Sequence, residues 1–117
     1  MSMVTVIIQN APYQPGNKAW NALRFAGAAL ADDMEVQVHL LEDGVQLGRR
    51  NHEVPEGAEN LEELIAELIE CGLVVRACGK SVDDYGISED ELITGVEKGS
   101  MKSLAGWVKE SDNTIAF

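Results

Sequence analysis

The residue of this sequence with the clearest chemical potential is Cys78, which follows the apolar run at 73–77 and precedes Gly79. In a parallel sheet with helices on both faces, the carboxyl ends of the strands form the crevice where ligands and reactive groups collect. A thiol at that position lies near the free N–H groups of the next turn, which favour thiolate over thiol. We therefore expect either a reactive cysteine at the rim of the sheet or a small buried side chain that caps the strand.

Several other residues should lie near this thiol if residues 73–77 form a strand. Side chains alternate along a strand, so Arg76 should share the face of Cys78, and its charge, like that of Lys80, would favour an anionic sulfur. Asn10 and Asp43 each follow another predicted strand and should reach the same crevice, where a small molecule could also bind. The expected neighbours of the thiol are Asn10, Asp43, Arg76, Gly79, Lys80 and Ser81.

The remaining cysteine and the two histidines suggest structural roles. Cys71 precedes Gly72 at a predicted helix end, and we expect it to be a buried structural thiol. An extended segment would separate it from Cys78 by about 16 Å, whereas bridged Cα atoms lie within about 7 Å, so no disulfide is expected. His39 should be a hydrogen-bonded strand residue and His52 a solvated loop residue, and neither has the close spacing of a zinc site.

Cofactor-binding motifs are missing from the sequence. No glycine-rich dinucleotide or triphosphate motif follows a predicted strand. The loop at 10–17 contains two prolines, which lack N–H groups, and no Ser or Thr, so it is poorly suited to cradle the phosphate of a flavin. We predict no cofactor and no metal, and therefore no conventional small-molecule active site.

The hydrophobic pattern predicts alternating strands and helices. A β-branched run at 4–8 is typical of a strand buried on both faces, and apolar residues at 18–31 recur at helical spacing. A second strand follows at 36–41, Asn60 with Glu63 opens a helix that ends at Gly72, and the third strand leads to Cys78. Further patterns predict a strand near 92–96, a helix after Ser100 and a strand at 114–117. The expected fold is a three-layer α/β/α sandwich, flavodoxin-like, with a mainly parallel five-stranded sheet.

Composition and charge narrow the functional classes. The 117 residues, 45% hydrophobic and 25% charged, suit one folded domain spanning 1–117. A formal net charge of -11 repels nucleic-acid phosphates and anionic membrane surfaces. No apolar stretch is long enough to span a bilayer, and no secretory signal is readable. We therefore expect a cytoplasmic protein with reduced thiols that binds neither nucleic acid nor membranes.

A set of short motifs is distributed along the chain in a fixed order. They are NALRFA at 21–26, LEDGV at 41–45, CGLVV at 71–75 leading to ACG at 77–79, YGI at 85–87, and a final pattern of GV, GSM, Trp and Phe between Gly95 and Phe117. Their order and spacing resemble the DsrE/DsrF-like family of small sulfur-relay proteins over nearly the whole chain. The resemblance implies an α/β/α domain that assembles into trimers or hexamers.

The resemblance also implies a role for one cysteine. In relay members, a cysteine at the strand end that Cys78 occupies takes up sulfur as a persulfide and passes it from a donor protein to an acceptor protein. Relatives often carry a second cysteine three residues later, where this chain has Ser81, so only one-thiol chemistry remains. The alternative is an oligomeric interaction module or small-ligand-binding module of the same fold, in which Cys78 is inert and the acidic surface selects basic partners.

Overall fold

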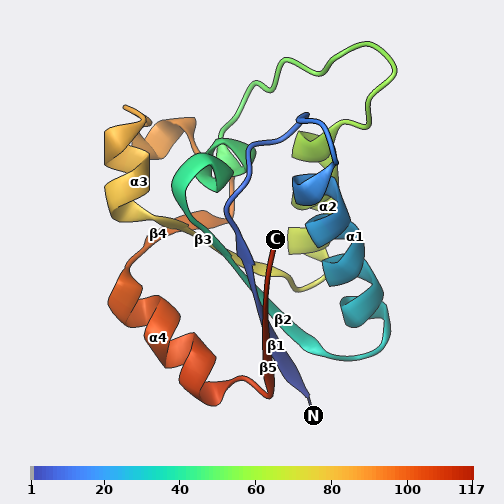
Figure 1. Ribbon diagram of the computed structural model, residues 1–117, viewed down its shortest axis with the longest axis vertical. Coiled ribbons are helices and arrows are strands. Elements are labelled where there is room, and N and C mark those ends of the chain that lie inside the picture. Colours follow the sequence, from blue (N-terminus) through green and yellow to red (C-terminus); the bar gives the residue numbers. More distant parts are fainter. Residues whose placement is uncertain (1) are drawn as a thin grey trace.

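The computed structural model describes residues 2–117 and shows a five-stranded parallel sheet with helices around it (Figure 1). The strands are β1 (Met3–Ile8), β2 (Glu35–Leu40), β3 (Val74–Cys78), β4 (Val96–Gly99) and β5 (Asn113–Ala116). The helices are α1 (Lys18–Ala31), α2 (Leu61–Glu70), α3 (Gly79–Asp84) and α4 (Met101–Glu110), with 3-10 helices η1 (Glu42–Gly48) and η2 (Glu89–Glu91). The predicted α/β class and parallel sheet are confirmed.

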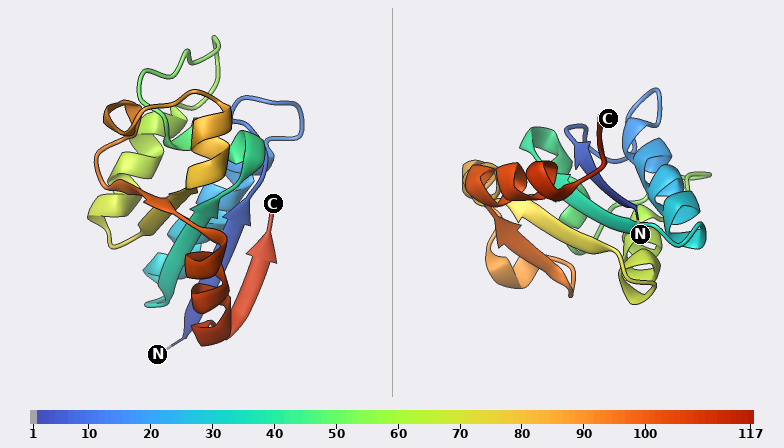
Figure 2. Two further views of the ribbon diagram at one scale, coloured as in Figure 1. Left: turned by 90° about the vertical axis from the view of Figure 1, so that its left-hand side faces the viewer. Right: turned by 90° about the horizontal axis from the view of Figure 1, so that it is seen from below.

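The strand order is β4-β3-β2-β1-β5, and every pair of neighbours is parallel. From β1 to β4, each successive strand is therefore added toward the same edge of the sheet. The chain then returns and places β5 on the other side of β1. The connection that makes this return contains α4. Figure 2 shows α4 on one face of the sheet and both α1 and α2 on the opposite face.

The main core lies between the sheet and the pair α1 and α2. Alternate strand residues face this side, including Val4, Val6, Ile8, Val36, Val38, Leu40, Val75 and Ala77. The connection from β3 to β4 joins the same core through Val82, Ile87, Leu92 and Ile93. The other face of the sheet is therefore covered by α4, whose buried residues are Leu104 and Trp107.

Helix starts follow their sequence signals closely. The Asn60 side chain accepts a hydrogen bond from the Glu63 N–H at 3.1 Å, and Ser100 and Ser103 cap α4 reciprocally at 3.1 and 2.9 Å. These contacts confirm the predicted helix starts. Within the part of the chain that the structure describes, no helix is long and apolar enough to cross a membrane.

One predicted strand is displaced. We placed the fourth strand near 92–96, but β4 begins only at Val96. Leu92 and Ile93 instead bury their side chains in the main core, after the capping box of Ser88 and Glu91 has opened η2. A short apolar pair has no periodicity, so it does not distinguish a strand from a buried loop.

Candidate functional site

Cys78 is the last residue of β3 and the N-cap residue of α3. Its register partner on β4 is Gly99. The thiol is free but only 4% exposed. The thiol is therefore not open to solvent in this structure, because β4 runs alongside to the same level and α3 begins at the next residue. Burial of the side chain agrees with the alternative of a capping hydrophobic residue, although it does not decide the chemistry.

The face of the sheet that Cys78 occupies is the one beneath α4. Val75 and Ala77 belong to the main core, so strand alternation places Arg76 and Cys78 together on the opposite face. On the neighbouring strand β2, the register partner of Arg76 is His39. An imidazole, a guanidinium and a thiol therefore share this face.

His39 is fully buried, and neither of its ring nitrogens has a hydrogen-bond partner among residues 2–117. Our prediction of a hydrogen-bonded strand residue is therefore wrong. The backbone hydrogen bonds of the sheet do not involve the imidazole, which lies on the face covered by α4, where no described group bonds to it. Gln37, two residues earlier on β2, has a further buried unpartnered atom, Oε1. Burial lowers the pKa of His39, and the charge of Arg76 lowers it further. The ring is thus neutral near pH 7, with one N–H donor and one acceptor unused.

Arg76 extends toward the level of Cys78. A Cβ atom added to Gly99 would lie 3.0 Å from Arg76 Cβ and 3.4 Å from Arg76 Cδ, so the arginine stem passes directly over this glycine. The guanidinium carbon lies 4.4 Å from the ring centroid of Trp107, a cation–π contact with α4. Glu97 is the register partner of Arg76 on β4, but within residues 2–117 Arg76 forms no ion pair. A half-buried positive charge thus lies on the same face of the sheet as the thiol, without a carboxylate in contact among the described residues.

The residues that follow Cys78 form the first turn of α3. Gly79 is half-buried, and Ser81 is buried with its Oγ accepting a hydrogen bond from the Glu42 N–H at 3.0 Å. Lys80 is exposed and pairs with Asp84 at 2.9 Å. That contact is the main reason why the pKa of Lys80 is raised, and the nearby Cys78 sulfur acts in the same direction. Lys80 is therefore a second cation, on the exposed side of the turn that follows Cys78.

Asn10 and Asp43 lie at the same end of the sheet as Cys78, where no bonded contact links their side chains to its thiol among the described residues. The Leu41 N–H donates to the Ile8 carbonyl at 2.9 Å, so the segments that carry Asn10 and Asp43 start side by side. Asn10 is half-buried and Asp43 is exposed. Among the described residues, no hydrogen bond or ion pair joins either side chain to Cys78.

Tyr13 and His52 form a bonded network that the sequence did not reveal. The Tyr13 hydroxyl lies 2.8 Å from His52 Nδ1 and accepts from the Leu61 N–H at 3.1 Å, while His52 Nε2 lies 3.1 Å from the Leu47 carbonyl. His52 is half-buried, so our prediction of a solvated histidine is wrong. Burial lowers the pKa of His52 and raises that of Tyr13. This network joins the loop after β1 to the start of α2.

Two surface hollows flank the same network. One has a volume of about 490 Å³, and apolar residues that include Pro15, Trp20 and Pro55 line part of it. The other has a volume of about 380 Å³, and Arg49 and Arg50 are among its polar lining residues. Neither hollow is lined by Asn10, Asp43 or Cys78, so neither is the small-molecule crevice that we predicted near those residues.

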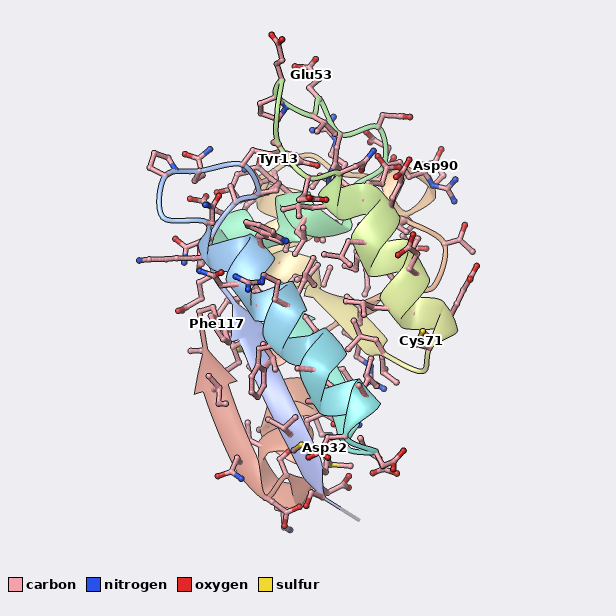
Figure 3. The ribbon with its side chains drawn as sticks, turned by 90° about the vertical axis from the view of Figure 1, so that its right-hand side faces the viewer. Tyr13, Asp32, Glu53, Cys71, Asp90 and Phe117 are labelled. Carbon is pink, nitrogen blue, oxygen red and sulfur yellow. The ribbon has the colours of Figure 1, made fainter. Side chains whose placement is uncertain are left out.

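Cys71 lies at the C-cap of α2, at the end of that helix in Figure 3. It precedes β3, whose opposite end carries Cys78. The position agrees with the sequence analysis, and both thiols are free. Cys71 is exposed, however, so our expectation of a buried structural thiol is wrong. Burial tendency is a statistical property of cysteine, and a C-cap position on the outer side of a helix overrides it.

Comparison with known proteins places the chain in a family. The model of the DsrE/DsrF-like family matches residues 3–117, and the chain belongs to this family. An uncharacterized protein of Methanopyrus kandleri, MK0008, is 44% identical over 117 residues, which cover 100% of this chain and 95% of the relative. A second uncharacterized protein, MJ0989 of Methanocaldococcus jannaschii, is 42% identical over 113 residues, with 97% of each chain covered.

Solved structures show the same fold. The crystal structure of the YchN protein of Escherichia coli matches with a TM-score of 0.91 at 28% identity, covering 100% of both chains. The protein MTH1491 of Methanobacterium thermoautotrophicum, whose function is unknown, matches with a TM-score of 0.80 at 18% identity, covering 98% of this chain and 99% of the other. At this lower identity, the likeness concerns the fold alone.

Proposed function

We propose that this chain is a cytoplasmic sulfur carrier that holds sulfur as a persulfide on Cys78 and works in a homo-oligomer of three or six copies. The observation that carries the proposal is the position of Cys78 at the end of β3 in a DsrE/DsrF-like chain, with Arg76 and Lys80 as nearby cations. Cations favour the anionic forms of a thiol and of a persulfide. Nucleophilic sulfur chemistry needs those forms.

The transfer step conserves atoms and electrons. The Cys78 thiolate attacks the outer sulfur of a donor persulfide, a new S–S bond forms on Cys78, and the S–S bond of the donor breaks. The donor leaves as a thiolate that takes the electron pair and picks up the proton that Cys78 lost. The reverse step on an acceptor thiolate releases the sulfur, so no external oxidant is required.

Burial of Cys78 sets a condition on this function. A side chain that is 4% exposed is not open to attack by a protein thiol, so the segments around it must move when a donor docks. α3 has only six residues, so its local unfolding requires little free energy. We therefore expect slow alkylation of Cys78 in the free protein beside rapid alkylation of the exposed Cys71.

Sulfur uptake tests the proposal directly. The reduced protein is incubated with sodium disulfide under nitrogen, desalted and weighed intact, and its peptides are then mapped. We expect one added sulfur atom on the peptide of Cys78 in the wild type and in Cys71→Ser, and none on that peptide in Cys78→Ser. If the wild-type protein takes up no sulfur at Cys78, the proposed carrier function is refuted.

A specific feature favours the alternative, an interaction module with an inert Cys78. Residues 51–75 contain seven glutamates and no Lys or Arg, and this segment includes the whole of α2. Such a surface attracts basic partners at long range. If Cys78 reacts only after denaturation while the folded protein binds polylysine in a salt-dependent way, the module is the better description.

A further inference from the structure

On the face of the sheet beneath α4, two polar side chains lack hydrogen-bond or ion-pair partners among the described residues. His39 has two unpartnered ring nitrogens, although none of its surface is exposed. A buried polar group without a partner costs about 1–3 kcal/mol, and native proteins rarely retain one without a reason. Arg76 lies next to it in the register, half-buried and without an ion pair among the described residues. Together they offer an N–H donor without an acceptor and a positive charge without a carboxylate in contact, among the described residues.

The two side chains lie within reach of Cys78. Arg76 is two residues before Cys78 on β3, so its register partner His39 lies about 7 Å down the sheet from the thiol level and one strand spacing of about 5 Å across. The arginine stem leans to the other side of β3, since it passes beside Gly99, the register partner of Cys78 on β4, so His39 and Arg76 flank the thiol from the β2 side and the β4 side. A persulfide extends the cysteine by one S–S bond of about 2 Å. The added sulfur would thus extend from Cys78 along the face of the sheet that carries the other two side chains.

We propose that His39 and Arg76 form the binding site for the terminal sulfur of a Cys78 persulfide, with α4 as its cover. The inference rests on the proposed carrier function and specifies where the cargo is held. A persulfide is a stronger acid than its parent thiol, so the terminal sulfur is an anion near neutral pH. The guanidinium compensates its charge, and the His39 N–H donates a hydrogen bond to it. The lone cysteine and the unpartnered histidine then have one common explanation.

The consequence is that the site prefers the sulfurated cysteine over the free thiol. Equilibration with a mixture of sodium disulfide and sodium sulfide measures this preference. In this equilibrium, the Cys78 thiol reacts with hydrogen disulfide to give the Cys78 persulfide and hydrogen sulfide. One S–S bond forms and one breaks. An equilibrium measurement is independent of how easily the reagent reaches the buried thiol. Intact mass spectrometry on the Cys71→Ser background gives the sulfurated fraction of Cys78 alone.

Three variants separate the binding site from general effects. We expect His39→Leu and Arg76→Met each to lower the sulfuration constant about tenfold or more, the value of one hydrogen bond to a charged group. The matched control is Arg24→Met, because Arg24 also stacks on a tryptophan, with its guanidinium carbon 5.1 Å from the ring centroid of Trp20, on α1. The control should leave the constant unchanged within twofold.

The possible results lead to different conclusions. If the wild type becomes sulfurated and both variants keep its constant, the binding site is refuted while the carrier function stands. If the wild type takes up no sulfur at Cys78, the carrier function itself is refuted.

A second readout uses the unaltered side chains. The protein has two histidines, so the ring signals of His39 and His52 can be followed separately by NMR. Sulfuration should shift the His39 signals and raise its pKa, because an anion now faces the ring. His52 has bonded partners of its own and should not respond. Unchanged His39 signals in a fully sulfurated sample would overturn the assignment even if the variants had proved unstable.

Discussion

Replacing His39 by leucine should stabilise the protein. The imidazole is fully buried, and both its donor and its acceptor are unpartnered among residues 2–117, so its burial costs about 1–3 kcal/mol per polar atom. Leucine has a similar volume and no polar atoms, and a swap of this kind costs less than about 1.5 kcal/mol in packing. The two atoms together cost at least about 2 kcal/mol, so subtracting the packing cost leaves a gain of at least about 0.5 kcal/mol in the free energy of unfolding at pH 7.5.

Urea and thermal unfolding measure this gain. For a chain of 117 residues, each kcal/mol corresponds to about 4 °C in Tm, so Tm should rise by at least about 2 °C. The matched control is His52→Leu. Both ring nitrogens of His52 are bonded, so its loss removes one hydrogen-bond partner each from the Tyr13 hydroxyl and the Leu47 carbonyl and should destabilise.

The pH dependence provides an independent check. The pKa of His39 lies below 6.5 in the folded protein. As the pH falls through 6.5, the unfolded chain therefore binds a proton at His39 before the folded chain does. The associated stability is fully present above pH 6.5 and is lost as the pH falls below it, at up to about 1.4 kcal/mol per pH unit for each such histidine. His39→Leu should remove the His39 part of this loss between pH 7.5 and 5, and the part due to His52 should remain.

One result would refute the reasoning. If His39→Leu lowers the free energy of unfolding by 1 kcal/mol or more at pH 7.5 while its m value stays unchanged, the ring nitrogens must contribute favourably to the free folded protein. The polar surface beneath α4 would then be a satisfied structural network.

Other expectations concern particular contacts. Tyr13→Phe should lower the free energy of unfolding by about 1–3 kcal/mol in urea, because the Leu61 N–H and His52 Nδ1 lose their shared partner; an unchanged midpoint would contradict the network. Gly44→Ala should destabilise by about 1–3 kcal/mol or more, because a Cβ there would clash with the Ile8 carbonyl, and Gly106→Ala, with open space, serves as its control. Ser100→Ala should cost about 1 kcal/mol through the lost cap of α4, as read from the thermal midpoint. Sedimentation of the wild type should show a trimer or hexamer, and a monomer at working concentration would remove that part of the proposal.

Much of the fold could be predicted because its signals are local. The boundaries of α1 agree with the helical spacing of its apolar residues, and the starts of α2 and α4 agree with the caps at Asn60 and Ser100. The short elements α3 and η1 were missed, since six or seven residues carry too little periodicity. β4 was displaced because Leu92 and Ile93 fill the core without pairing as a strand.

The candidate site was harder to predict because it depends on distant segments. The sequence placed Cys78 at a strand end and Arg76 on its face, but solvent access depends on β4 and α3, which are not visible in the local pattern. The position of His39 beside Arg76 is a matter of register between β2 and β3. A histidine between aliphatic residues signals a buried ring, but its sequence context does not show that the ring nitrogens lack partners.

The alternation of side chains along β2 and β3 gives one sheet two separate interiors. Val38 and Val75 hold the α1 and α2 side together, whereas His39, Arg76 and Cys78 belong to a compartment closed by the last helix. Substitutions in one compartment should combine additively with those in the other, since they share no partners. New reactivity could therefore evolve beneath the last helix while the larger interior continues to specify the same architecture.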